Sequence, residues 1–248
     1  MIIYPEIFKD FNVIAAQSTR LGGVSLSPFS SMNLGLFVND VKESVINNRE
    51  LFFGKLGIDL QQIVLSKQVH GIDIYTADSP IINEGYDALI TNKAGLYLSV
   101  SIADCTPVLI YDKTNKAVAA IHAGWKGTVA EIVRHTLDKM HELYYTKGAD
   151  CAAYIGACIG YDNFEVGEEV AMHFDASFKK FDGIKQKWFV DLKSANKKQL
   201  MDCGLPSENI EISAYCTVKD EELFFSHRRD DGKTGRMMAV IGMKGRNH

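Results

Sequence analysis

The sequence predicts a fold that mixes helices with many short strands. Short apolar runs follow one another closely between residues 63 and 121, as in hairpins or a mixed sheet. A longer stretch, residues 128–144, carries its apolar side chains at helical spacing. Strands and helices do not alternate regularly, which argues against a doubly wound sheet. Because no linker-like segment or internal repeat occurs, we expect residues 1–248 to form a single domain.

Four segments are predicted to be helical. Segment 40–57 begins with Asp40 and Glu43, which are spaced as a capping box, and ends at Gly57. Segment 128–144 is the clearest helix, because its apolar residues form one stripe and two glycines precede it. Further helices are expected at 166–174 and 192–203. The predicted strands are 63–65, 72–76, 88–91, 97–102, 108–111, 117–121, 152–155, 210–214, 223–226 and 238–241.

Composition narrows the class of protein and its partners. The net charge is −4, which argues against nucleic acid as a partner, since a phosphate backbone usually requires a basic face. The first residues lack a secretory signal, and no apolar run is long enough to span a membrane. Five widely spaced cysteines without a CxxC pair do not suggest disulfides. We therefore expect a cytoplasmic protein with no membrane partner.

Three residues stand where predicted strands end. His70 follows the strand at 63–65, Cys105 lies between two strands, and His122 lies where a strand turns toward the long helix. Loops at strand ends are common places for active sites. Two imidazoles and a thiolate suit zinc, and three protein ligands leave one position open for water or substrate. The triple is therefore a candidate transition-metal centre.

Two other interpretations of the triple stay open at this point. The same residues suit a Cys–His nucleophile pair, in which His70 or His122 lowers the pKa of the Cys105 thiol. They also suit three unrelated core residues, because their spacing matches no short metal motif. No GxSxG, HExxH, Walker A or GxGxxG signature occurs to favour another class of enzyme.

Basic residues near the ends of the chain are candidate anion ligands. Arg228 and Arg229 offer rigid forks for an oxyanion such as phosphate, although a solvated turn with local ion pairs is the commoner role for such residues. Arg20 precedes two glycines that allow the backbone to approach a ligand closely, as a plain surface turn also would.

Taken together, these motifs resemble a family described first as laccase-domain or multicopper polyphenol oxidases and later as purine nucleoside phosphorylases. The most specific matches are HAGWKGT at 122–128, SHRRD at 226–230 and TGR at 234–236. The resemblance spans nearly the whole chain in the family's order. The matching segments are 18–25, 32–35, 48–49, 68–71, 87–91, 103–108, 120–128, 155–160, 165–167, 191–192 with Asn196, and 216–236.

The resemblance implies a fold, a metal and an activity. The implied fold is α+β, a four-layer α/β/β/α arrangement with mixed β-sheets, similar to the deamidase domain of cytotoxic necrotising toxins. The implied metal ligands are His70, Cys105 and His122, which would also be the catalytic residues, with zinc or copper bound. The implied activity of this single catalytic domain is phosphorolysis of adenosine, inosine, guanosine and methylthioadenosine, together with deamination of adenosine.

The implied partners are purine nucleosides and phosphate, in a monomer or small homo-oligomer. Arg20, Asn33, Arg228 and Arg229 are the expected substrate and phosphate ligands, and Asp104 is a candidate proton donor. A multicopper laccase is rejected, because about four coppers need many histidines and the chain has seven in total, with no HxH pair. The alternatives to a phosphorylase are a metal-free Cys–His hydrolase or amidase, a copper-dependent phenol oxidase, which is disfavoured, and a ligand-binding protein without turnover.

Overall fold

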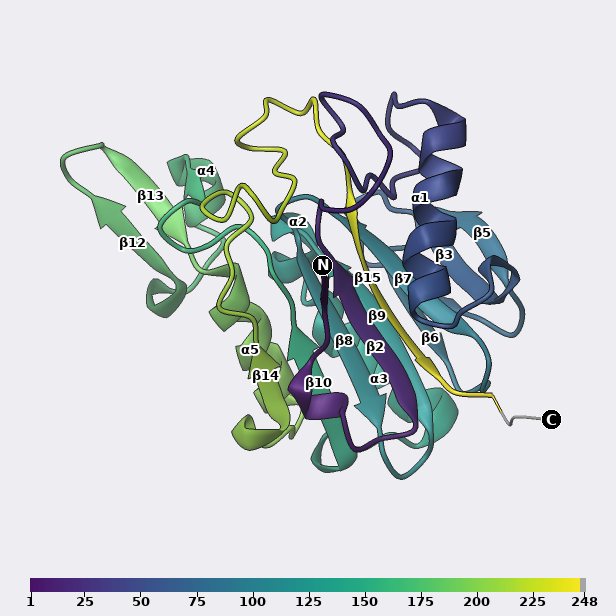
Figure 1. Ribbon diagram of the computed structural model, residues 1–248. Helices are drawn as coiled ribbons and strands as arrows, with labels where there is room; N and C mark the ends of the chain where they lie inside the picture. The colour runs from purple at the N-terminus through teal and green to yellow at the C-terminus, as the bar shows by residue number, and fades with distance from the viewer. Residues whose placement is uncertain (246–248) are drawn as a thin grey trace.

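Two six-stranded mixed sheets form the centre of the molecule (Figure 1). The structure is a computed structural model that describes residues 1–245. The first sheet has the order β1 (Ile2–Ile3), β2 (Val13–Ser18), β15 (Met237–Met243), β7 (Tyr97–Ile102), β3 (Ile63–Lys67) and β5 (Ile81–Glu84). The second has the order β14 (Ile210–Ile212), β10 (Cys151–Ile155), β8 (Thr106–Asp112), β9 (Ala117–Ala123), β6 (Ala88–Thr91) and β4 (Ile74–Thr76).

The two sheets pack face to face, and alternation along each strand decides which side chains lie between them. On β9, Val118 and Ala120 belong to the core between the sheets, where they meet Leu98 from the first sheet. The next residues along β9, Ala119 and Ile121, belong to a second core on the opposite face. Each central strand is therefore apolar on both faces, as expected for a sheet that is covered on both sides.

Helices cover the two outer faces. Helix α1 (Lys42–Lys55) packs Phe52 and Phe53 against the first sheet. Helices α3 (Ile132–Tyr144) and α5 (Leu192–Asp202) cover the second sheet. The predicted four-layer α/β/β/α arrangement is therefore confirmed. No helix within residues 1–245 is long and apolar enough to cross a lipid bilayer.

Short elements complete the description. A small sheet of β11 (Glu165–Val166), β13 (Lys187–Val190) and β12 (Lys179–Asp182) projects from the main body (Figure 1). The short α-helices are α2 (Trp125–Val129) and α4 (Glu168–Ala171). The 3-10 helices are η1 (Glu6–Phe8), η2 (Leu60–Gln62), η3 (Gly148–Asp150), η4 (Ala176–Phe178) and η5 (Ser207–Asn209).

The predicted helix at 128–144 is broken in two. Helix α2 begins earlier than predicted, and the chain turns at Glu131, whose φ is +57°, before α3 begins. In an unbroken helix the Thr128 carbonyl would accept from the N–H of Ile132. That carbonyl instead accepts hydrogen bonds from the N–H of Glu131 at 3.1 Å and from the side chain of Gln199 at 2.8 Å. The break thus depends on a tertiary contact with α5 that periodicity does not reveal.

Three other sequence predictions were wrong in part. Asp40 does not cap α1, because its carboxylate accepts from Ser25 and Asn33 instead, and no side-chain cap is present. The predicted helix at 166–174 is reduced to α4, since residues 165–166 pair with β13 as a strand. Segment 223–226 is not a strand: both of its phenylalanines are fully buried in the same core, whereas a strand would place them on opposite faces.

Candidate metal centre

The three candidate ligands meet where the chain crosses between the two sheets. His70 lies in the connection from β3, in the first sheet, to β4, in the second. Cys105 lies in the tight turn from β7 to β8, which also passes from the first sheet to the second. His122 is the penultimate residue of β9. Its side chain lies on the same face of the strand as Val118 and Ala120, which face the other sheet. Three segments far apart in sequence therefore deliver one side chain each to the same end of the sandwich.

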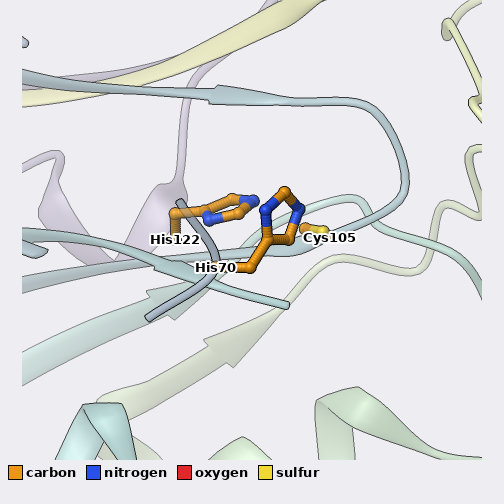
Figure 2. A group of neighbouring side chains, drawn as sticks. All are labelled: His70, Cys105 and His122. Carbon is orange, nitrogen blue, oxygen red and sulfur yellow. The ribbon is translucent and has the colours of Figure 1, made fainter. Parts of the chain in front are cut away.

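The ligand atoms of His70, Cys105 and His122 all lie within 4.8 Å of one another (Figure 2). The two imidazole rings stand edge to face, with their centroids 4.9 Å apart. Gly124 leaves room for this approach: a Cβ there would lie 3.1 Å from His70 Cδ2 and 3.2 Å from Cys105 Sγ. Side chains that converge in this way form a set of one sulfur and two nitrogen donors, which can hold a transition metal.

A buried carboxylate, Asp87, fixes two of the three ligands. Its side chain is fully buried and lies 2.8 Å from Nδ1 of His122. The same carboxylate accepts the backbone N–H groups of Val69, His70 and Gly71 at 2.8–3.1 Å. Asp87 therefore holds both the His122 ring and the loop that carries the His70 side chain.

This clamp sets the orientation of His122 and the backbone of His70. An ionised carboxylate can only accept hydrogen bonds, so Nδ1 of His122 donates to Asp87, and Nε2 is the ring nitrogen that is left for Cys105 or for a metal. His70 has φ +62°, a left-handed conformation that is uncommon for residues other than glycine. The hydrogen bond from its N–H to Asp87 stabilises that conformation.

The electrostatics of the site favour a cysteine thiolate. Burial alone would raise the pKa of Cys105, but the charge of His122 and hydrogen bonds from His122 and His70 lower it to about 6. Burial would likewise lower the pKa of His122, but the Cys105 thiolate and Asp87 raise it to about 9. Burial opposes ionisation of Asp87 as well, yet its hydrogen bonds with His122 and the loop lower its pKa. The arrangement thus supplies a thiolate at neutral pH, the form that binds metals and acts as a nucleophile.

The ligands open into a cavity of about 470 Å³, a size typical of small-molecule sites. Several of its lining residues are apolar or aromatic. Those residues are Phe37, Val38, Trp125, Ile159 and Phe164. Other lining residues are basic, namely Lys67, His227, Arg228 and Arg236.

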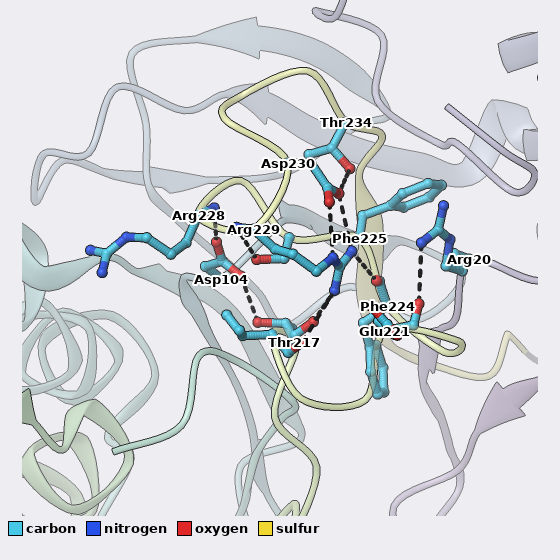
Figure 3. A network of polar contacts seen from close by, with 12 residues as sticks. Arg20, Asp104, Thr217, Glu221, Phe224, Phe225, Arg228, Arg229, Asp230 and Thr234 are labelled. Atoms are coloured by element: carbon cyan, nitrogen blue, oxygen red, sulfur yellow. Dashed lines mark hydrogen bonds and ion pairs between the residues drawn. The ribbon is translucent and has the colours of Figure 1, made fainter. Parts of the chain in front are cut away.

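Of the four predicted substrate ligands, the structure brings Arg228 to this cavity. Its side chain is exposed, lies over the ring of Phe164 at 5.4 Å, and donates to the carbonyl of Glu165 at 2.8 Å. Figure 3 shows its guanidinium directed away from the network formed by its neighbours.

Arg229 lies outside the cavity lining. Its guanidinium donates to the carbonyls of Thr217 and Phe224 and pairs with both carboxylate oxygens of Asp230 (Figure 3). Its side chain therefore ties together the segment that contains the SHRRD motif. A role for Arg229 in holding phosphate stays a prediction.

Arg20 and Asn33 also lie outside the cavity lining. Arg20 donates to the carbonyls of Ser30 and Glu221, and it faces a shallow depression elsewhere on the surface. Asn33 is fully buried and donates to the carboxylate of Asp40. Direct contact of either residue with substrate stays a prediction.

Asp104 fastens the C-terminal segment to the turn that carries Cys105. Its φ is +86°, and its two carboxylate oxygens accept from the hydroxyl of Thr217 at 2.6 Å and the N–H of Arg228 at 2.7 Å. Its carbonyl accepts from the N–H of Ile159 at 2.9 Å. These contacts hold Arg228 and Ile159, two residues of the cavity lining, against the turn that carries the thiol.

Sequence reasoning missed the roles of Asp87 and Arg236. Both residues occur in segments that matched the family, but neither segment alone shows which side chain contacts the site. Asp87 acts through hydrogen bonds that join residues distant in sequence, and Arg236 reaches the cavity because β15 lies between β2 and β7.

Comparison with known proteins places the chain in a family. Residues 14–244 match the family model described as multi-copper polyphenol oxidoreductase laccase, and the chain belongs to that family. Among residues 1–245, the group of His70, Cys105 and His122 is the one set of at least three His, Cys, Asp or Glu side chains arranged to hold a metal. The described part of the chain thus offers one candidate metal centre of this kind rather than several.

Relatives and solved structures agree over nearly the full length. Purine nucleoside phosphorylase YlmD of Bacillus subtilis is 37% identical over 94% of this chain and 89% of its own. Purine nucleoside phosphorylase YfiH of Escherichia coli is 34% identical, with 97% and 98% covered. The crystal structure of hypothetical protein YfiH from Bacillus licheniformis superposes with a TM-score of 0.91 at 34% identity, covering 98% of this chain and 96% of that one. YlmD from Geobacillus stearothermophilus gives a TM-score of 0.90 at 32% identity, with 97% and 94% covered.

Proposed function

We propose that this chain is a zinc-dependent purine nucleoside phosphorylase. The observation that carries the proposal is the convergence of His70, Cys105 and His122 at a cavity that is lined by both aromatic and basic side chains. Relatives that cover nearly the whole chain bear the name of this activity. The substrates are purine nucleosides, including adenosine, inosine, guanosine and methylthioadenosine, and inorganic phosphate.

The donor set fits zinc. Two imidazoles and one thiolate are zinc ligands, and three protein ligands are typical of catalytic rather than structural zinc. The pKa of about 6 for Cys105 means that the thiolate form is available at neutral pH. Bound zinc would supply Lewis-acid stabilisation of negative charge that develops on the substrate. Copper can bind the same donors, so metal analysis has to accompany every activity measurement.

The residues that line the cavity suit the binding of both substrates, the nucleoside and phosphate. Phe37, Trp125 and Phe164 offer flat apolar surface to a purine base, and the basic side chains offer donors to phosphate. An oxygen of hydrogen phosphate forms a bond to C1′ of the ribose while the bond from C1′ to the purine nitrogen breaks. The electron pair leaves with the base, and the phosphate proton ends on the base. The products are ribose 1-phosphate and the free purine.

A product assay tests this proposal. Purified protein is incubated with adenosine, inosine or methylthioadenosine, with and without phosphate. The free base and the sugar 1-phosphate are quantified, the latter being ribose 1-phosphate, or 5-methylthioribose 1-phosphate from methylthioadenosine. The proposal expects equal amounts of both products and a rate that requires phosphate. Base release that is independent of phosphate, or no base release from any of the nucleosides by metal-loaded protein, would contradict it.

We infer adenosine deamination as a second activity of the same site. A donor set with three protein ligands leaves room for water as well as for phosphate or nucleoside. The measurement is release of ammonia and inosine from adenosine without phosphate. The inference is lost if base release is present and ammonia release stays at the level of a protein-free control.

One observation favours a rival, a metal-free Cys–His hydrolase. The pKa of Cys105 is lowered to about 6 and that of His122 is raised to about 9, as in a thiolate–imidazolium pair. Chelation and alkylation separate the two candidates. Our proposal expects chelator-treated protein to lose activity and regain it with zinc, whereas a thiol hydrolase would survive chelation and be inactivated by alkylation.

We also propose that the chain acts as a single catalytic domain, in the cytoplasm, as a monomer or small homo-oligomer. All five cysteines are free, which suits a reducing compartment. Strand β15, near the C-terminus, pairs with β2, near the N-terminus, which supports one cooperative unit. Light scattering of the purified protein measures the oligomeric state.

A further inference from the structure

Arg236 is the residue immediately before β15, and its side chain lines the cavity that contains His70, Cys105 and His122, here called the metal cavity. Hydrogen bonds of its main chain and of its guanidinium hold it in place. Its N–H donates to Oδ1 of Asn33 at 2.9 Å, and its carbonyl accepts from the N–H of Leu34 at 3.0 Å. One guanidinium nitrogen, Nη1, donates to the carbonyls of Thr234 and Gly235 at 2.9 and 3.0 Å. The side chain is therefore fixed before any ligand arrives.

The rest of the Arg236 guanidinium is unused. An arginine carries five N–H donors, and the contacts of Nη1 account for two of them. Within residues 1–245, Nε and Nη2 donate to no protein acceptor, and no carboxylate forms an ion pair with the group. The pKa of Arg236 is lowered, because the effect of burial exceeds the opposing effect of the negative charges of Cys105 and Asp104. Nε and Nη2 are not among the buried polar atoms that lack a partner, and the residue lines the cavity, so both donors are accessible to an anion that enters it.

Other arginines around the site differ from Arg236. Arg229 has its charge compensated by Asp230 and lies outside the cavity lining. Arg228 lines the cavity, but it is exposed and its Nη1 donates to a main-chain carbonyl. Arg49 is buried without an ion pair among the described residues, yet it lies away from the cavity, over the ring of a phenylalanine of α1. Arg236 alone among these four combines a place in the lining, partial burial and a fixed fork of free donors.

Gly35 completes the setting of this arginine. A Cβ at Gly35 would lie 2.8 Å from Cγ of Arg236 and 3.0 Å from its Cβ, so any side chain there would displace the stem. Asn33 Oδ1 accepts the N–H groups of both Gly35 and Arg236, at 3.1 and 2.9 Å. Asn33 and Gly35 thus position Arg236 without lying on its guanidinium.

We propose that Arg236 binds the phosphate that attacks C1′, with Nε and Nη2 donating to two phosphate oxygens. Planar, side-by-side N–H donors match two oxygens of one phosphate, which a lysine ammonium cannot reproduce. Asn33 is then a positioning residue for the phosphate ligand. This assignment rests on the proposed phosphorolysis, and it concerns which residue holds one of the two substrates.

Three variants of the zinc-loaded protein test the assignment. Arg236→Gln removes the charge, Arg236→Lys keeps the charge without the planar pair of donors, and Gly35→Ala displaces the aliphatic part of the Arg236 side chain. Arg134→Gln, on the far side of the second sheet, is the matched control. Steady-state kinetics are measured with phosphate varied at saturating inosine, and then with inosine varied at saturating phosphate. Calorimetric titration with inorganic phosphate measures binding directly, and elemental analysis checks that the metal is retained.

Arg236→Gln should raise the KM for phosphate by about 10- to 100-fold, the value of one or two charge-assisted hydrogen bonds, and weaken calorimetric binding equally. Arg236→Lys and Gly35→Ala should fall between that variant and wild type, while the KM for inosine changes little. An unchanged KM for phosphate in active Arg236→Gln, or an effect on inosine alone, would overturn the assignment. If wild type lacks phosphorolysis, the proposed function fails; loss of phosphate binding in Arg236→Gln would still support the anion site, and equal or absent binding would refute it.

Discussion

Two cavities of the molecule each have a volume of about 470 Å³, and each is lined by one cysteine and at least one histidine. They differ in the distance between these side chains and in the pKa of the thiol. In the metal cavity, Cys105 and His122 meet within ligand distance, and the pKa of the thiol is lowered to about 6. In the second cavity, between α3 and α5, Nδ1 of His141 donates to the main-chain carbonyl of Thr146 at 2.9 Å, and burial together with the charge of Asp138 raises the pKa of Cys203. Cavity size and residue types therefore do not define a site.

Convergence around a buried carboxylate distinguishes the first cavity. Asp87 has its charge compensated by an imidazole and three N–H groups, so it orders its surroundings. The acidic residues of the second cavity lie near the half-buried Arg134, which forms long contacts with Glu131 at 3.4 Å and Asp202 at 3.8 Å. Surface pairs of this kind contribute little to stability or geometry.

The largest expected effect separates the two partly exposed cysteines. Cys105→Ala should lose its metal and reduce phosphorolysis by more than the ~10–100-fold that is typical for loss of an outer-shell partner. Cys203→Ala should retain both. Activity assays and elemental analysis of the two variants measure this difference, and full metal content with full activity in Cys105→Ala would contradict a metal-centred site.

Asp87→Asn should weaken metal binding by about 10- to 100-fold, because the amide cannot accept from His122 and the His70 loop as the carboxylate does. Competition with a coloured chelator measures the affinity for zinc. Asp138→Asn, in the second cavity, is the control and should bind zinc as wild type does. Equal zinc affinity in Asp87→Asn and wild type would remove Asp87 from the account of the site.

Alkylation of the metal-free protein should distinguish the thiols by pH. The thiolate is the reactive form, so the rate at Cys105 should rise as pH increases through about 6 and then level off. Cys203, with its pKa raised, should react only at alkaline pH, so that at pH 7 Cys105 reacts roughly ten times faster or more. Peptide mass spectrometry after timed iodoacetamide treatment gives both rates, and parallel pH profiles would show that the imidazoles do not activate Cys105.

The smallest effect is expected from Arg134→Gln. Its ion pairs are exposed, so the free energy of unfolding should change by less than about 1 kcal/mol, with unchanged kinetics. Urea denaturation followed by circular dichroism measures the stability. A loss well above that value would mean that the second cavity has a structural role which its geometry does not indicate.

Local sequence patterns predicted much of the fold. The strands 88–91 and 97–102 have the predicted bounds. Their sequences, ALIT and YLSVSI, are short segments rich in apolar residues, the second alternates apolar residues with serine, and both strands pair on both sides. Strand β2 was not predicted, although it pairs with β1 and β15; its sequence, VIAAQS, has only a short apolar run, and two of those four residues are alanines, which have low strand propensity. The break at Glu131 could not be predicted either, since it depends on the Gln199 side chain from a distant helix.

The site was predictable where residue chemistry is distinctive and not where position decides. His70, Cys105 and His122 are unusual residues at strand ends, and the structure does bring them together. The sequence motifs pointed to Arg229 as a phosphate ligand, yet its guanidinium donates to main-chain carbonyls and to Asp230. Arg236, which was not predicted, lines the cavity. Which arginine keeps free donors depends on the path of the backbone between the two sheets, and no short motif records that.

The most direct test of the central claim is metal content measured together with phosphorolysis during stepwise removal of metal. The account predicts about one zinc ion per chain, activity that falls in proportion to zinc lost, and recovery on adding zinc back. Full phosphorolytic activity in protein freed of metal, abolished only by alkylation of Cys105, would contradict it.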